Sequence, residues 1–130
     1  MPLFVPSTLY YLSAALNALT IPKHMSVGFK NIYSAAEAIP QNSALGKAKH
    51  IIGPTWDYAT VSLILLTAMN VMWARKGGPG SVEEKWILWA TVIGGAIVGW
   101  QYYSCKMYAG LGTLWGAPLL SLVAFLWQGA

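Results

Sequence analysis

The stretch YATVSLILLTAMNVMWA, residues Tyr58–Ala74, contains no charged side chain. It is nearly as long as the roughly 20 residues that a helix needs to cross the hydrocarbon core of a bilayer. Because backbone groups inside a bilayer must be satisfied within their own segment, this stretch predicts a transmembrane helix. The residues directly before it, GPTWD, place Pro54 and Asp57 at its start.

Uncharged blocks of similar length occur on both sides of this stretch, at residues 3–21, 86–104 and 107–127. Every Lys, Arg and Glu lies between the blocks. The chain of 130 residues is 56% hydrophobic and only 9% charged, whereas soluble domains carry about 25% charged residues. We therefore expect an all-α, polytopic membrane protein, one domain over residues 1–130. Its bundle of four transmembrane helices is predicted at about 3–21, 54–74, 82–104 and 107–128.

The longest predicted connection separates the first two helices. Pro22 disfavours helix at Ile21 and predicts that the first helix ends there. Apolar residues then recur at helical spacing, which predicts a short interfacial helix between helices 1 and 2, with an ordered loop as the alternative: Phe29, Ile32, Tyr33 and Ala36. The second helix is expected to begin at Pro54, a residue favoured in a first turn. Asp57 would then lie near the positive end of the helix dipole.

Small residues predict how the last two helices pack. Gly95 and Gly99 are four apart in the third helix, as are Gly112 and Gly116 in the fourth. Such pairs let helix backbones approach closely in a bilayer, so we expect a tight hairpin, with a dimer seam as the alternative. Ser81 and Glu84 have the spacing of a capping box at the start of the third helix.

Charge distribution sets the expected surroundings. The basic residues are scattered, which excludes a nucleic-acid site and favours contact with anionic lipid headgroups. The amino end, MPLFVPS, has no basic residue, which favours a retained helix over a cleaved signal peptide. More basic residues lie on the side of the long loop 22–53 than on the side of the termini, so this loop is expected to be cytoplasmic. Cys105 is alone and forms no internal disulfide.

Polar residues follow one face of each of the first two predicted helices. On the first they recur in steps of three and four: Tyr10, Ser13, Asn17, Thr20 and His24. On the second they are Asp57, Thr60 and Thr67, with Asn70 beside them. Unmet polar groups are unfavourable in lipid, so both faces should point inward. Antiparallel pairing would then bring His24 close to Asp57.

A histidine beside a carboxylate is an oriented acid–base pair, so His24 and Asp57 are the candidate catalytic residues. The candidate substrate-binding residues are Tyr10, Asn17, Thr20, Thr60, Thr67, Asn70, Gln101 and Tyr102. This site would bind or transform an apolar, lipid-like molecule, as an isomerase, cyclase or oxygenase would. No cofactor and no metal site is predicted, since His24, His50 and Asp57 lack a ligand-spacing motif.

Other interpretations stay open. The polar faces could serve helix packing alone. The chain could be a non-catalytic accessory subunit of a larger membrane complex, or form a homo-oligomer. A channel or transporter ranks last, because no predicted helix has a charge at mid-membrane.

Overall fold

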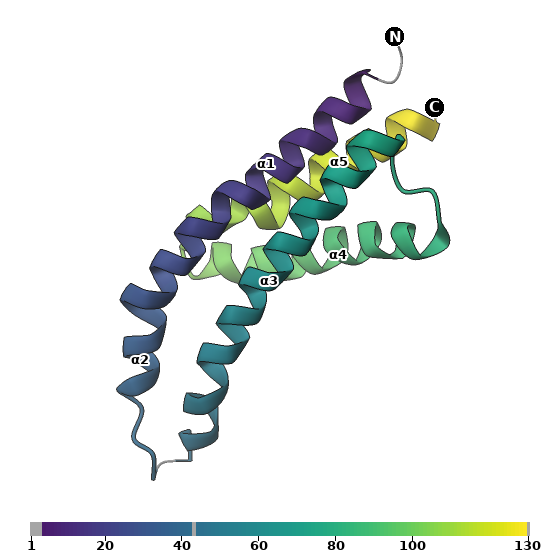
Figure 1. The fold of residues 1–130 in the computed structure, drawn as a ribbon. Coiled ribbons are helices and arrows are strands. Elements are labelled where there is room, and N and C mark those ends of the chain that lie inside the picture. The colour runs from purple at the N-terminus through teal and green to yellow at the C-terminus, as the bar shows by residue number, and fades with distance from the viewer. Residues whose placement is uncertain (1–3, 43, 130) are drawn as a thin grey trace.

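The computed structural model describes residues 4–42 and 44–129, and within them the fold is helical throughout. The long helices are α1 (Phe4–Val27), α3 (Gly46–Lys76), α4 (Val82–Ser104) and α5 (Ala117–Gly129). Shorter pieces are the π-helix η1 (Gly28–Ile32), helix α2 (Tyr33–Glu37), the 3₁₀ turn η2 (Tyr108–Gly110) and the π-helix η3 (Gly112–Gly116). The start of α1 and the end of α5 lie at the same end of the molecule (Figure 1).

Two helical segments of the described chain are long and apolar enough to cross a membrane. They are Gly46–Lys76, which is α3, and Tyr108–Gly129, which runs from η2 to the end of α5. The helices of the described residues confirm the all-α class.

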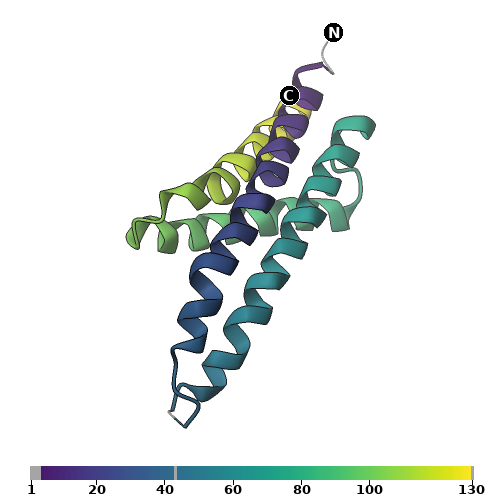
Figure 2. The same cartoon turned by 60° about the vertical axis from the view of Figure 1, so that its left-hand side comes forward.

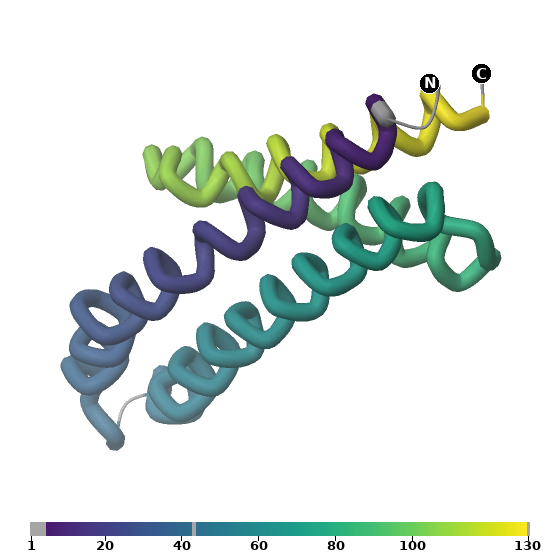
Figure 3. The backbone as a smooth tube through the Cα atoms, turned by 45° about the horizontal axis from the view of Figure 1, so that its top comes forward, coloured from purple at the N-terminus to yellow at the C-terminus, as the bar shows by residue number. Residues whose placement is uncertain are grey.

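Helices α1 and α3 run antiparallel and pack against each other along much of their length (Figures 1 and 3). η1 and α2 continue in line with α1, and the connection to α3 covers only residues 38–45. Residues 28–42 and 44–55, which we call the arm, extend beyond the region where α4 and α5 pack (Figure 2).

The helix boundaries predicted beside the prolines are wrong. Pro22 lies inside α1 and Pro54 lies inside α3. The expected interfacial helix is a continuation of α1 rather than a separate element. A proline removes one backbone hydrogen bond and disfavours helix at the residue before it. Contact between the two antiparallel helices offsets this loss. Asp57 consequently lies well inside α3, so the predicted position in a first turn is also wrong.

The start of α4 is as the sequence predicts. Ser81 caps the helix: the Glu84 amide donates to Ser81 Oγ and the Ser81 amide donates to Glu84 Oε2, both at 3.3 Å. Lys76, at the end of α3, forms an ion pair with Glu84 across the loop. This pair links the ends of α3 and α4.

The predicted glycine hairpin is half right. Gly95 and Gly99 of α4 are buried, and η3 packs against them. A Cβ added at Gly112 would have nothing within 4 Å, however, and one added at Gly116 would contact Leu16 of α1. The fourth predicted helix is also interrupted, by η2 and η3, before α5 begins. The close approach therefore uses the glycines of one helix only.

A polar network lies at the centre of α1, α3 and α5. Ser121 Oγ lies 2.6 Å from Asn70 Oδ1 and 2.8 Å from Ser13 Oγ, and Ser13 donates to the Ala117 carbonyl at 2.8 Å. Asn17 accepts a hydrogen bond from Thr113 of η3. Ser13, Asn17, Asn70 and Ser121 are all buried. This network joins three helices and favours one register between them, because buried polar groups must meet their partners.

Candidate functional site

A cleft opens where the arm meets the connection between α4 and α5. Neighbouring hollows of about 430, 560 and 250 Å³ all include His24 and Tyr102 in their lining. α1 contributes Thr20, α3 contributes Trp56, and the α4–α5 connection contributes Met107 and Tyr108. Pockets for small molecules typically span about 300–1,000 Å³, so this cleft has the size of a ligand site.

His24 and Trp56 form one wall of the cleft. Their rings stack with centroids 3.9 Å apart and planes 5° apart. His24 Nε2 lies 3.0 Å from the Trp56 carbonyl oxygen, and Trp56 Nε1 donates to the His24 carbonyl at 3.1 Å. Gly28 makes room for the indole, because a Cβ there would lie 2.7 Å from Trp56 Nε1. Each residue thus holds the other in place.

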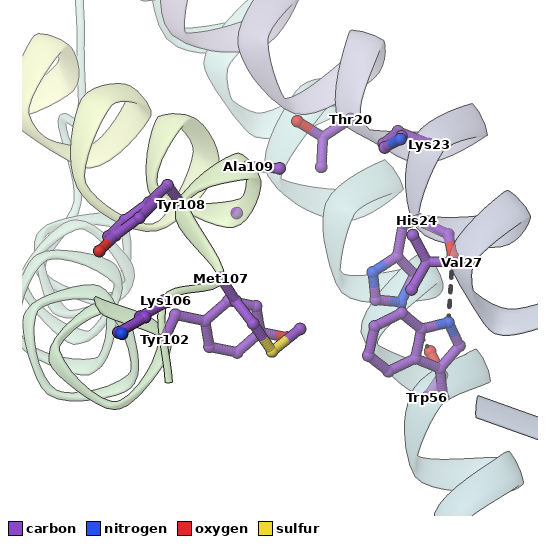
Figure 4. A pocket seen from close by; sticks show the side chains of 11 residues that line it. Thr20, Lys23, His24, Val27, Trp56, Tyr102, Lys106, Met107, Tyr108 and Ala109 are labelled. Atoms are coloured by element: carbon purple, nitrogen blue, oxygen red, sulfur yellow. Dashed lines mark hydrogen bonds between the residues drawn. The ribbon is translucent and has the colours of Figure 1, made fainter. Parts of the chain in front are cut away.

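The Trp56 carbonyl selects the tautomer of the neutral His24 ring. A carbonyl oxygen only accepts, so Nε2 must carry the proton. In the neutral imidazole Nδ1 is then a hydrogen-bond acceptor. Nδ1 is on the side of the ring that faces the opening of the cleft (Figure 4). His24 therefore offers a free nitrogen to whatever the cleft holds.

The opposite wall comes from α4 and the connection that follows it. Tyr102, Met107 and Tyr108 lie across the opening from His24 and Trp56 (Figure 4). Aromatic rings and a thioether make this wall largely apolar and adaptable. The cleft is consequently a slot between two largely apolar, partly aromatic walls, with His24 as a polar group on one of them.

The predicted pairing of His24 with Asp57 is wrong. Among the hydrogen bonds and ion pairs of the described residues, none joins these two side chains. Asp57 accepts a hydrogen bond from the Tyr33 hydroxyl instead. The bond uses the phenolic proton, and this raises the pKa of Tyr33 because loss of that proton would break the bond. Because α3 begins at Gly46 and η1 continues α1, Tyr33 of α2 reaches the carboxylate that the sequence assigned to His24.

The predicted substrate-binding residues separate into groups. Thr20 and Tyr102 line the cleft with His24. Tyr10, Asn17 and Asn70 are buried in helix contacts, where Tyr10 donates to Gln128 Oε1 at 3.4 Å.

The remaining predicted residues lie elsewhere. Thr60 lines a smaller hollow of about 180 Å³ with Asp57. Thr67 donates to the Leu63 carbonyl of its own helix, and Gln101 is exposed. The inward direction of the α1 polar face is thus confirmed over Tyr10, Ser13 and Asn17, but most of that face packs helices.

Several site residues were not foreseen. From the sequence, Trp56 was interpreted as an aromatic residue at the membrane interface and Lys106 as a loop lysine. Thr113, Ser121 and Gln128 complete the polar contacts from the last helix, where the expected pattern was only apolar and glycine-rich. One usable signal was the pair Pro22 and Pro54, each two residues before a member of the His24–Trp56 pair.

Irregular helix borders the cleft on two sides. The π-helix η1 follows directly after Val27, and the π-helix η3 contributes Thr113 and Leu114 to the lining. Short π-helical stretches occur frequently at functional sites. No group of three His, Cys, Asp or Glu side chains in the described residues could hold a metal ion.

Comparison with known proteins adds no assignment: no protein family, curated protein or solved structure matches this chain.

Proposed function

We propose that this chain is an integral membrane protein of four transmembrane helices whose cleft binds an apolar, lipid-like small molecule, with His24 as the polar contact. The observation that carries the proposal is the His24 ring, which the Trp56 carbonyl fixes so that Nδ1 faces the cleft. A largely apolar slot with a few placed polar groups is the usual composition of a small-molecule site.

The lengths and surfaces of α1 and α4 support their place in the bilayer beside α3 and α5. They contain 24 and 23 residues, or about 35 Å each at about 1.5 Å per residue, against roughly 30 Å of hydrocarbon. Large apolar side chains are exposed on both: Tyr11, Leu12 and Leu19 on α1, and Trp86, Ile93, Ile97 and Trp100 on α4. Lipid would cover these side chains.

The atom of His24 that is available for chemistry is Nδ1, and its role depends on whether the ring is neutral or protonated. As a neutral ring, Nδ1 accepts a proton or a hydrogen bond from a ligand hydroxyl or enol. As an imidazolium, it donates to a ligand oxygen. Proton transfer of this kind suits isomerisation or cyclisation of an apolar substrate, without help from Asp57.

The test is the organic extract of the purified protein. We expect a defined apolar molecule at about one per chain in wild type, as a single pocket implies. His24→Phe keeps a flat ring but removes both nitrogens, so the bound amount should fall about 3- to 10-fold, the value of one hydrogen bond. Lys30→Gln is the control, since Lys30 lies in η1 and does not line the cleft.

Two outcomes would count against the proposal. A wild-type extract that matches the extract of the empty purification excludes a bound molecule. Terminal tags that map to opposite sides of the membrane exclude four crossings, which place both ends on one side. Conversion of the extracted molecule by wild type, absent in His24→Phe, would extend the function from binding to catalysis.

A further inference from the structure

Two lysines line the cleft from opposite rims. Lys23 comes from α1, one residue before His24, and Lys106 comes from the turn after α4 (Figure 4). Among the described residues that line this hollow, none is acidic. Neither lysine amine has a carboxylate within ion-pair distance in the described chain, whereas Lys76 is paired with Glu84. The slot therefore has a basic edge with no acidic counterpart of its own.

The backbone at Lys106 is the second observation. Its φ is 59°, and it is the only described non-glycine residue with a positive φ. The turn closes α4 with a Schellman pattern: the Met107 amide donates to the Tyr102 carbonyl at 2.9 Å and the Lys106 amide donates to the Tyr103 carbonyl at 3.0 Å. Glycine is the usual residue at this position.

The turn at the end of α3 has glycine where the turn after α4 has Lys106. Gly77 and Gly78 both have positive φ, and the Gly78 amide donates to the Trp73 carbonyl at 2.7 Å. At the equivalent place after α4 a lysine adopts the left-handed backbone without the conformational freedom of glycine. Strain of this kind is concentrated at functional sites.

We propose that the molecule bound in the cleft carries an acidic headgroup, a carboxylate or a phosphate, on an apolar body, and that Lys23 and Lys106 hold this headgroup. The inference rests on the proposed function, since it names the class of ligand that the same cleft binds. The Lys106 amine points away from His24 in the structure (Figure 4). Its four-carbon stem lets the amine turn toward a headgroup at the mouth, which Lys23 reaches from the other rim. Val27, Met107 and Ala109 then contact the apolar body.

Electrostatics favours this ligand class. Two amines beside a low-dielectric slot attract an anion more strongly than the same amines in water. A charge-assisted hydrogen bond is shorter and stronger than a neutral one. The imidazolium form of His24 would add a donor at Nδ1 on the same wall as Lys23, opposite Lys106. An anionic oxygen would then meet positive groups from both walls.

The experiment compares ligands that differ only in the headgroup. Hexadecanoic acid, hexadecyl phosphate and hexadecanol are titrated against the purified, delipidated protein, with displacement of a fluorescent apolar probe as the readout. We expect both acids to bind at least about 10-fold more tightly than the alcohol, since one charge-assisted hydrogen bond is worth about that factor. High salt should reduce this preference, because exposed charges are screened.

Variants locate the headgroup. The double variant Lys23→Gln, Lys106→Gln should lower the preference for acid over alcohol to within about twofold, while binding of the alcohol stays as in wild type. Lys30→Gln removes a lysine of η1 that does not line the cleft and should leave the preference intact. Lys106→Gly suits the backbone of the turn, so loss of acid binding in this variant cannot be ascribed to misfolding.

The outcomes separate the two proposals. Equal binding of acid and alcohol by wild type would overturn the headgroup assignment and leave the binding of an apolar molecule standing. Failure of all three ligands to displace the probe, with an empty organic extract, would remove both. Nanodiscs of phosphatidylglycerol and of phosphatidylcholine distinguish the source: retention of phosphatidylglycerol that depends on the two lysines identifies a bilayer lipid, and its absence identifies a free amphiphilic acid.

Discussion

Trp115 lies against Gly99, so closely that a Cβ at position 99 would lie 2.0 Å from the indole Nε1. The same indole nitrogen donates to the Ala96 carbonyl of α4 at 3.5 Å. One glycine thus makes room for a large aromatic side chain in the middle of the last apolar segment. This contact, with that of Gly95 on Leu114, sets how α4 packs on η3 and α5.

Alanine substitutions along α4 should therefore differ sharply in effect. Gly95→Ala and Gly99→Ala introduce a Cβ where the Leu114 carbonyl and Trp115 already lie, and should cost about 1–3 kcal/mol through overpacking. Gly94→Ala is the control, because nothing lies within 4 Å of a Cβ there. It should gain up to about 1 kcal/mol from helix propensity. Thermal unfolding in detergent measures these changes in stability. Equal melting temperatures for all three variants would refute the close packing of α4 against Leu114 and Trp115.

Ser121 is the centre of the buried polar network, so its loss should be felt across three helices. Ser121→Ala removes the contacts with Asn70 and Ser13 and should cost about 1–2 kcal/mol. Ser62→Ala makes the same chemical change on α3, where Ser62 donates only to the Tyr58 carbonyl of its own helix. That variant should remain within about 0.5 kcal/mol of wild type. Similar losses in the two variants would show that the network adds no stability.

Asp57→Asn tests the corrected position of the carboxylate. Asp57 bonds to Tyr33 rather than to His24, so ligand binding in the cleft should remain within about twofold of wild type. Hydrogen exchange should instead increase in α2, because the contact of Tyr33 with α3 is weakened. Tyr33→Phe should reproduce this exchange pattern. A loss of binding as large as that in His24→Phe would support the acid–base pair of His24 and Asp57 that the sequence predicted.

The two Schellman turns predict stability changes of opposite sign. Lys106→Gly relieves a left-handed backbone at a non-glycine residue and should stabilise the protein by about 1 kcal/mol. Gly77→Ala imposes the same strain at a φ of 86°, with no side-chain clash to confuse the result, and should destabilise it by a similar amount. Chemical denaturation of both variants gives the two values. Destabilisation by Lys106→Gly would show that the lysine side chain supports the turn.

Much of the fold followed from local features of the sequence. The start of α4 was predictable because a capping box joins residues only three apart. The inward polar face of α1 was predictable because helical periodicity places Tyr10, Ser13 and Asn17 on one side. The helical class followed from long uncharged blocks, since composition alone carries that signal.

The candidate site was only partly predictable. His24, Thr20 and Tyr102 do line one cleft, but the partner of His24 is Trp56 rather than Asp57. The error arose at Pro22 and Pro54, where local preference predicts a helix end. A prediction that ends one helix and starts the next at these prolines shortens both helices and removes the arm.

The sequence by itself determined the helical class, the apolar segments, the cap of α4 and the polar side of α1, because each depends on residues within a few positions of one another. The tertiary structure decided the course of α1 and α3 through their prolines, the contact of Trp56 with His24, and the place of Lys106 beside Lys23. These depend on contacts between segments far apart in the chain. Packing of that kind outweighs local preference, and no local pattern records it.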